Sequence, residues 1–234
     1  MDVVELLIYF GITRQEASIY VTLLSQGDLN GYEVAKFTGI SRSNTYTSLA
    51  SLVEKGIAYV IEGSTTRYTP VYPEEFCDNK IRKLTQIKQD ILNNLPQKKS
   101  EMEGYITIKG TIHILNKMRN MISEAKERVY LSVSKQVLEE IIPEIKSAID
   151  RKIKIVLISN DVLNLEGAVI YYEEKSRQQI RLIADSTNVL TGDVDDGEYS
   201  TCLYSKKKNL IDLVKDSLKN EIELISLAKR GDEQ

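Results

Sequence analysis

The stretch GITRQEASIYVTLLSQGDLNGYEVAKFTGISRSNTYTSLASLVEKGIAYVIEGSTTRYTPVYP, residues 11–73, decides the fold of the first part of this chain. Two helix starts stand out in it. Thr13 is followed three residues later by Glu16, and Asn30 by Glu33, which is the spacing of a capping box. Apolar residues then recur at helical intervals after each start. The pattern therefore predicts two short helices in succession.

A third helix is expected to begin at Ser41 and to end at Gly56. After it, residues 57–62 alternate in polarity, residues 63–66 form a turn, and residues 67–69 return, which predicts a hairpin. We expect the inward-facing residues of the second and third helices to be Val34, Phe37, Tyr46, Leu49, Leu52 and Val53. Three helices followed by a hairpin are the order of a winged helix-turn-helix, a DNA-reading fold.

The third helix leaves a face of small polar residues free, mostly in its first two turns. That is the part of a recognition helix that meets base edges and phosphates in the major groove. We expect DNA contacts from Arg42, Ser43, Asn44, Thr45, Thr47 and Ser48 on this helix, and from Thr65, Thr66 and Arg67, with Arg67 at the hairpin tip. The alternative is a small helical domain with a surface hairpin that binds no nucleic acid.

Several motifs of this stretch resemble a known family. They are G-I-T-x-x-E-A at 11–17, S-R-S-x-x-Y at 41–46 and L-V-E-K-G at 52–56, within a resemblance that covers about residues 5–76. Over this region the chain is similar to the TrmB-type transcriptional regulators. The resemblance implies a domain that binds double-stranded operator DNA as part of a homodimer. Many members respond to sugars or other small effectors, so a small-molecule effector such as a sugar is implied as well.

The composition of the chain limits the kinds of function that it can have. The 234 residues are 42% hydrophobic and carry a formal net charge of −3, so any DNA contact must come from locally placed cations rather than from a strongly basic domain. No apolar run is long enough for a membrane span, and no secretory signal is evident, which favours a cytoplasmic protein. Cys77 and Cys202 lie far apart, without metal-ligand spacing, and are expected to be free thiols. No metal or cofactor is expected.

Residues 74–99 read as one long helix with a coiled-coil-like seam. The apolar spacing alternates between four and three residues, with Lys88 as a flaw, along Cys77, Ile81, Leu84, Lys88, Ile91 and Leu95. We expect this helix to pair with its copy in a homodimer, since two DNA readers must be held at a fixed spacing. The alternative is a connecting helix packed on its own chain. The sequence thus divides into a winged helix-turn-helix domain at 1–73, a linker and dimerisation helix at 74–100, and a further domain at 104–234.

Strands and helices alternate in this last domain. Strands are expected at 105–109, 128–134, 153–159, 168–172, 179–184, 188–191 and 199–204, and helices at 111–125, 136–151 and 209–228. The closing helix should turn Leu210, Leu213, Val214, Leu218, Ile222 and Ile225 inward. This order predicts a mixed α/β sheet covered by helices, so that the whole chain is of the α+β or α/β class.

The same domain distantly resembles the phospholipase D-like fold. Catalytic members carry a histidine and a lysine seven and five positions before an aspartate, but counting back from Asp185 gives Gln178 and Ile180. His113, the single histidine, falls in an expected helix and should be an ordinary surface or half-buried residue. We therefore expect no catalytic residues. The alternative is a phospholipase D-like phosphodiesterase or sensor enzyme that the first domain recruits.

Ligand sites in sheets of this kind lie at strand ends. The candidate polar contacts for an effector are Ser134, Asn160, Asp161 and Asp185, in the loops after three of the expected strands. Any one of them also fits an ordinary solvated loop residue. The acidic run at 193–198 departs from a calcium-loop pattern and is expected to be a solvated loop.

Overall fold

The computed structural model describes residues 2–96, 104–160, 165–173, 179–194 and 200–232. It divides into two compact units, Met1–Gln97 and Lys98–Gln234, and each is described here by itself. No helix in these described ranges is both long and apolar enough to cross a lipid bilayer.

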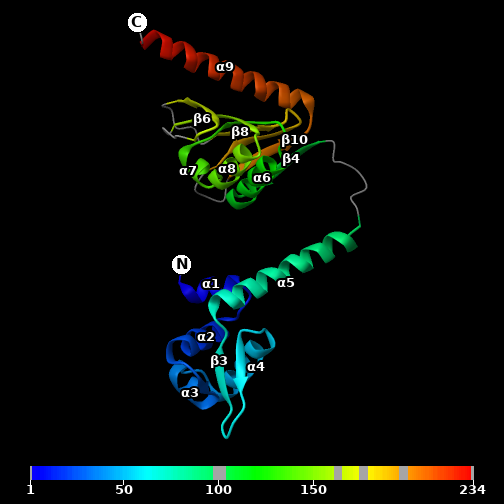
Figure 1. Ribbon diagram of the computed structural model, residues 1–234. Coiled ribbons are helices and arrows are strands. Elements are labelled where there is room, and N and C mark those ends of the chain that lie inside the picture. The colour runs from blue at the N-terminus through cyan, green and yellow to red at the C-terminus, as the bar shows by residue number, and fades with distance from the viewer. Residues whose placement is uncertain (1, 97–103, 161–164, 174–178, 195–199, 233–234) are drawn as a thin grey trace. The chain divides into compact units, whose positions relative to one another are not determined.

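The first unit is a helical domain with a small antiparallel sheet of order β1-β3-β2 (Figure 1). Its elements are α1 (Val3–Tyr9), α2 (Arg14–Gln26), β1 (Leu29–Asn30), α3 (Gly31–Thr38), α4 (Arg42–Glu54), β2 (Ala58–Ile61), β3 (Arg67–Pro70) and α5 (Pro73–Asn94). The three helices α2, α3 and α4 followed by the β2–β3 hairpin make the expected winged helix-turn-helix, and α1 and α5 flank it.

Both capping boxes form as predicted. The Thr13 hydroxyl accepts a hydrogen bond from the Glu16 amide at 3.3 Å, and the Glu16 carboxylate accepts one from the Thr13 amide at 2.7 Å. Asn30 and Glu33 make the same reciprocal pair, with both bonds at 2.9 Å. These bonds satisfy amides that a helix leaves unpaired at its start. The starts of α2 and α3 are therefore set by residues within one turn.

The core of the first unit includes the start of α5. Phe76 is buried and meets Phe10 and Tyr20 edge to face, with ring centroids 5.3 and 5.8 Å apart. The Tyr20 hydroxyl donates to the Val71 carbonyl at 2.7 Å. Because Phe76 lies in this core, the first turn of α5 is part of the same unit as α2, α3 and α4.

Two residues of the first unit that were expected to face the core are exposed instead. Phe37 on α3 and Tyr46 on α4 are 57% and 50% exposed. On α4 the inward stripe instead runs through Thr45, Ser48, Leu49 and Leu52, which share one face at helical spacing.

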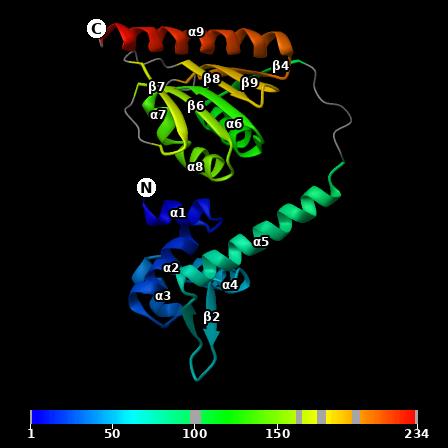
Figure 2. The same cartoon turned by 45° about the horizontal axis from the view of Figure 1, so that its top comes forward.

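The second unit is a mixed sheet of seven strands with helices on both faces (Figure 2). Its elements are β4 (Tyr105–Lys109), α6 (Thr111–Glu124), β5 (Arg128–Ser132), α7 (Lys135–Glu139), α8 (Ile142–Asp150), β6 (Lys154–Ser159), β7 (Ala168–Tyr172), β8 (Gln179–Ala184), β9 (Asn188–Asp193), β10 (Thr201–Ser205) and α9 (Lys208–Asp232). The strand order is β4-β10-β9-β8-β5-β6-β7, in which β5, β6 and β7 are parallel and all other neighbours are antiparallel.

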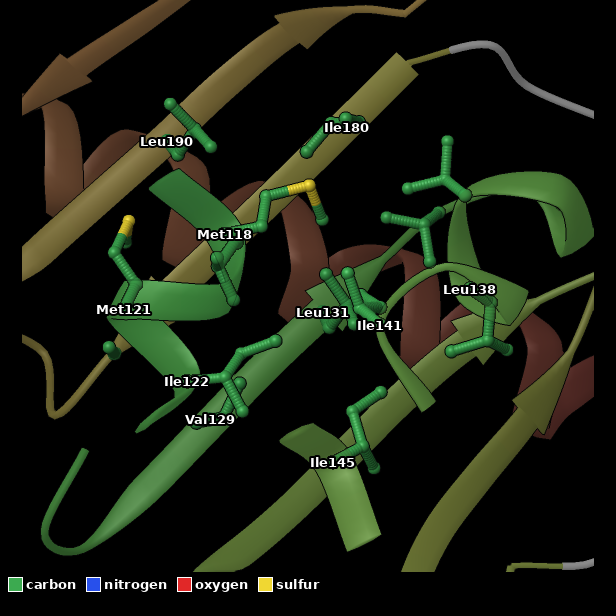
Figure 3. Packing of buried hydrophobic residues seen from close by; sticks show 14 of the residues in the cluster. Met118, Met121, Ile122, Val129, Leu131, Leu138, Ile141, Ile145, Ile180 and Leu190 are labelled. Carbon is green, nitrogen blue, oxygen red and sulfur yellow. The ribbon is translucent and has the colours of Figure 1, made fainter. Parts of the chain in front are cut away.

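Two apolar layers cover the sheet. On one face Met118 and Ile122 of α6 and Ile145 of α8 pack against Leu131 and Ile180 of the strands (Figure 3). On the other face α9 lies alone over the sheet (Figure 2) and buries a smaller cluster. The second face is therefore covered by one helix where the first is covered by three.

Two details of this unit differ from the expectation. The helix expected at 136–151 is two helices, because Pro143 lies in the first turn of α8, where a proline favours a helix start and cannot continue a preceding helix. On α9, Leu213 is 67% exposed, and Ile211 takes a buried place instead. The buried face of α9 is therefore rotated slightly about the helix axis relative to the predicted face.

An ion pair between the buried Glu16 and the partly exposed Lys55 joins α2 to the end of α4. The Lys55 ammonium donates to both Glu16 carboxylate oxygens, at 2.8 and 2.6 Å. Burial raises the pKa of Glu16, but hydrogen bonds from Lys55, Ser51 and Thr13 outweigh it and lower that pKa from 4.5 to about 2. A carboxyl whose pKa is lower in the folded chain stabilises the fold above its unfolded pKa, and that contribution is lost as the pH falls toward the folded value.

We therefore expect the free energy of unfolding to fall between pH 4.5 and about pH 2 more steeply in the natural chain than in a Glu16→Gln variant. Urea unfolding of the full chain at a series of pH values measures it. The control is Glu62→Gln, on an exposed hairpin loop, which should keep the natural profile. An unchanged profile in Glu16→Gln would contradict this role of the ion pair.

Candidate nucleic-acid interface and effector site

The exposed start of α4 carries four of the expected DNA contacts. Arg42, Ser43, Asn44 and Thr47 are exposed, and Ser41 caps the helix by accepting a hydrogen bond from the Asn44 amide at 3.4 Å. Short polar side chains and the unpaired amides of a helix start are suited to base edges and phosphate oxygens. This part of the predicted surface is available to a duplex.

Thr45 and Ser48 were wrongly placed on this free face. Thr45 is fully buried and Ser48 is 7% exposed. The Thr45 hydroxyl donates to the Ser41 carbonyl at 3.0 Å, so it is satisfied within its own helix. Small hydroxyl side chains with such local bonds can be buried where a helix packs closely. These two residues belong to the packing of the domain.

Tyr46 takes a place on the exposed side and lies against α3. A Cβ atom added at Gly31 would be 2.4 Å from Cε1 of the Tyr46 ring, closer than any real contact. Gly31 is therefore the residue that lets the ring approach the first turn of α3. The sequence showed Tyr46 only as one more apolar residue, and the signal that could have separated it is the glycine beside the Asn30 cap.

Arg42 also contacts α3. Its guanidinium lies 4.8 Å from the centroid of the Tyr32 ring, a cation–π contact. The tyrosine is half exposed, so the contact orients the cation without removing it from solvent. The first turns of α3 and α4 together form the surface that we call the reading face: Tyr32, Arg42, Ser43, Asn44, Tyr46 and Thr47.

Arg67 does not lie at the tip of the hairpin. It is the first residue of β3 and pairs in register with Ile61, so residues 62–66 form the tip and carry the exposed Thr65 and Thr66. The Arg67 guanidinium donates to the Asp28 carbonyl at 2.5 Å and lies 3.5 Å from the Glu33 carboxylate. Its charge holds the hairpin to the start of α3.

Two of the effector candidates come together at one edge of the second sheet. Ser134 follows β5 and caps α7 by accepting from the Val137 amide at 3.5 Å, and Asn160 follows β6 and accepts from the Lys135 amide at 2.9 Å. Because β5 and β6 are parallel, their carboxyl ends meet at this edge. Both side chains hold the start of α7. Asp161 lies outside the described residues.

Asp185 was wrongly grouped with them. It follows β8, which runs antiparallel to β5, so it lies at the opposite edge of the sheet. Its carboxylate accepts hydrogen bonds from the amides of Lys126, Glu127 and Arg128, each at 2.9 Å. Burial raises the pKa of Asp185, but these amides outweigh it and lower that pKa. The residue ties the β8–β9 turn to the start of β5.

The position that a phospholipase D-like lysine would take is filled by a core residue. Ile180 is fully buried in the cluster beneath α6, and Gln178 lies outside the described residues. His113 is exposed, as expected.

Comparison with known proteins identifies both units. Residues 6–74 match the family described as sugar-specific transcriptional regulator TrmB, and residues 104–218 match the family described as transcriptional regulator TrmB, EBD N-terminal subdomain. Together these matches span well over half of the chain.

Three proteins of known sequence are similar to this chain over most of its length. The uncharacterized protein YrhO of Bacillus subtilis is 26% identical over 98% of this chain and 87% of its own length. The sugar-sensing transcriptional regulator TrmBL1 of Pyrococcus furiosus is 27% identical over 68% of this chain, but over only 48% of its own length. The DNA-binding transcriptional repressor TrmBL2 of Thermococcus kodakarensis is 26% identical over 75% of this chain and 74% of its own length.

The reading face predicts the effect of two substitutions. Arg42→Ala and Asn44→Ala should each weaken operator binding by about 1–3 kcal/mol, because each removes hydrogen bonds to bases or phosphates. Fluorescence anisotropy at fixed salt, with an operator isolated by selection from random duplexes, measures the affinity. Arg82→Ala and Asn79→Ala on α5 are the matched controls. Natural affinity in both α4 variants would disprove the reading face.

The contact of Gly31 with Tyr46 predicts a non-additive pair. Gly31→Ala should destabilise the chain by about 1–3 kcal/mol and weaken operator binding, since the added methyl group pushes the ring and α4 away from α3. In a Tyr46→Ala background the same change should cost little. Gly104→Ala, in the second unit and with no atom within 4 Å, is the control. Equal costs in both backgrounds would show that the ring does not set this spacing.

Proposed function

Because this chain belongs to the TrmB family of transcriptional regulators, whose winged helix-turn-helix binds DNA, we propose that it acts as a homodimer on a two-fold operator. We further propose that a small molecule bound to the second unit changes its affinity for that operator. The observation that carries the proposal is a row of apolar side chains along α5. This helix starts in the core of the first unit, and the described residues of that unit leave the row exposed to solvent.

The apolar row supports pairing between two copies. From the third turn of α5 onward its large apolar side chains are about half exposed: Ile81, Leu84, Ile87, Ile91, Leu92 and Leu95. The helix ends at Asn94, so Leu95 follows as its cap. An exposed apolar stripe at this spacing is typical of a helix that packs against a partner. Within the first unit, the described residues leave this row exposed, and pairing with the same row of a second copy would bury it.

The anchoring of α5 supports a fixed spacing of the two reading faces. Phe76 is buried beside Phe10 and Tyr20, so the first turn of α5 cannot rotate independently of the domain. When two α5 helices pair, the two α4 helices are therefore held at one separation. Half-sites on one side of a duplex lie roughly 34 Å apart, and a dimer reads both only if its spacing matches.

The charge distribution supports a shallow salt dependence. Residues 1–72 carry more acidic than basic side chains, Lys55 is paired with Glu16, and Arg67 is tied to Asp28 and Glu33. Arg42 is then the main side-chain cation of the reading face, and helix-start amides supply other phosphate contacts. Few counterions are released per subunit, so the affinity should fall less steeply with salt than in strongly basic regulators.

The effector proposal draws on the family and on the second sheet. The family is described as sugar-specific and TrmBL1 as sugar sensing, so we propose a small molecule such as a sugar for this chain. Coupling of ordinary size would change operator affinity by roughly 5–150-fold. The carboxyl ends of β5 and β6, near Ser134 and Asn160, are one place for it.

We propose that the second unit does not hydrolyse phosphodiesters. The relatives with an assigned function are regulators, and the position of the catalytic lysine is held by the fully buried Ile180. A buried aliphatic side chain provides neither a nucleophile nor a proton. We propose the cytoplasm as the location, where a regulator meets its operator.

If α5 forms the dimer interface, a charged residue in its apolar row should give a monomeric protein. Leu84→Glu should place an unpaired charge in the apolar row, at a cost that favours separate chains, and should weaken operator binding because the two reading faces are no longer linked. Sedimentation velocity at micromolar concentration measures the mass. Asn93→Glu, on the opposite side of α5, is the matched control. A Leu84→Glu variant that stays dimeric with normal stability would place the interface elsewhere.

A further inference from the structure

One face of α5 changes from aromatic to basic after its first turn. Phe76 is buried in the core of the first unit, and Asn79, Lys80 and Lys83 follow it at helical spacing on the same face. No acidic residue stands three or four positions before or after either lysine, so neither has the usual ion-pair partner along its helix. Within the described part of the chain, neither lysine makes an ion pair or a hydrogen bond.

The two lysines border a small pocket of the first unit. Its volume is about 160 Å³, and it is lined by α5 and by the segments that directly follow α1 and α4. Lys80 is partly buried beside Gly11, where an added Cβ atom would be 3.3 Å from the Lys80 Nζ. Lys55 lines the same pocket and is fixed there by its two hydrogen bonds to Glu16. Three ammonium groups therefore line a space smaller than the roughly 300 Å³ at which small-molecule sites usually begin.

The positive charge of this pocket exceeds the negative charge around it. No lining residue is acidic, and the Glu16 carboxylate is already bound to Lys55. The helices α1 and α4 both end here, and a helix end carries only about half a negative charge. Carbonyl groups at these ends already accept hydrogen bonds from the amides of Gly11, Ile12 and Gly56. Like charges held together in one pocket repel each other, and a bound anion removes that repulsion.

The lining also selects the chemical class of the ligand. Asn79 accepts a hydrogen bond from Arg82 at 3.0 Å through its Oδ1, which leaves its amide nitrogen as a donor. The other polar side chains of the pocket are lysines, which only donate. A cation or a neutral polyol therefore finds no free side-chain acceptor, whereas an oxyanion accepts from every polar side chain of the lining. A carboxylate has two oxygens, but a phosphate group has at least three and can bind several ammonium groups at once.

We propose that this pocket binds a small phosphate, either inorganic phosphate or a short phosphate monoester, through Lys55, Lys80, Lys83 and Asn79. The bound anion connects the end of α4 to the second and third turns of α5, so it extends the anchoring of α5 beyond Phe76. The site does not depend on the DNA, dimer or effector functions proposed above.

The pocket lies at the opposite end of α4 from the reading face. Arg42 begins that helix and Lys55 follows its last residue, a separation of about 20 Å at 1.5 Å per residue. A duplex on the reading face therefore leaves the pocket open to a small anion.

Thermal unfolding and calorimetry of the full chain, at constant ionic strength, test the site. The probes are inorganic phosphate and glycerol 3-phosphate, with acetate as an anion of fewer oxygens and lower charge. We expect saturable binding and a raised melting temperature with one or both phosphates, because a ligand that binds only the folded chain stabilises it. Acetate should bind roughly tenfold more weakly, since it accepts fewer charged hydrogen bonds. Saturable binding of neither phosphate, or equal binding of acetate, would overturn the proposal.

Two variants locate the anion. Lys80→Gln and Lys83→Gln should each weaken phosphate binding roughly tenfold, the loss expected for one hydrogen bond to a charged group. Without phosphate, neither should lower the melting temperature, because each removes one of the repelling charges. Lys146→Gln, exposed on α8, removes the same charge elsewhere and is the matched control. Natural phosphate affinity in both pocket variants would show that the anion does not bind here.

Operator binding separates a small phosphate from the phosphates of a DNA backbone. Lys80→Gln and Lys83→Gln should keep the natural operator affinity and its salt dependence, since neither lysine contacts the duplex in this proposal. A shallower salt dependence in these variants, together with unchanged binding of the small phosphates, would assign the lysines to the DNA backbone and overturn the proposal.

Discussion

The Glu16 carboxylate is the contact on which the geometry of the DNA-reading unit depends. It closes the capping box of α2 through the Thr13 amide and receives the Lys55 ammonium just after α4. Two helices of different direction are thus tied to one buried charge. Removing Lys55 leaves the buried Glu16 carboxylate without its cation, which costs more than the pair contributes. The end of α4 is therefore held in place.

The start of α4 is held by packing. The Tyr46 ring lies against Gly31, and Arg42 lies over Tyr32, so the first turns of α3 and α4 keep a fixed separation. With both ends of α4 held, the exposed Ser43, Asn44 and Thr47 are presented on a rigid element. If this surface contacts DNA as we propose, its few charges make such rigidity important, because affinity would then come from well-placed hydrogen bonds more than from counterion release.

The second unit is arranged differently on its two faces. Three helices cover a large apolar layer on one face (Figure 3), and the other face holds a small apolar cluster under α9 with the Arg181–Glu221 pair at its side. Apolar contacts are not directional, whereas the ion pair and hydrogen bonds of Arg181 fix the position of α9 on the sheet.

The sequence by itself determined the local structure of this protein. Both capping boxes and most strands formed where the pattern predicted them, because these signals act between residues within one turn or along one strand. The order of elements was enough to predict the winged helix-turn-helix and the mixed sheet. The exposure of Arg42, Ser43, Asn44 and Thr47 was also predicted from the sequence, since these residues follow the Ser41 cap directly, and their contact with DNA stays a prediction.

The tertiary structure alone decided which sides of the elements meet. Thr45 was expected on the exposed face of α4 and is buried, whereas Tyr46 was expected inside and is half exposed. Gly31, which has no side chain, leaves room for the Tyr46 ring beside α3, and no pattern within α4 contains that information. Arg67 was expected at the hairpin tip but lies in β3, where the strand register pairs it with Ile61. Asp185 was expected beside Ser134 and Asn160 but lies at the opposite edge of the sheet, because β8 runs antiparallel to β5. The Arg181–Glu221 pair joins residues forty positions apart in the sequence. Such contacts depend on strand order and helix rotation, which are settled by the packing of the whole unit and not by the spacing of neighbouring residues.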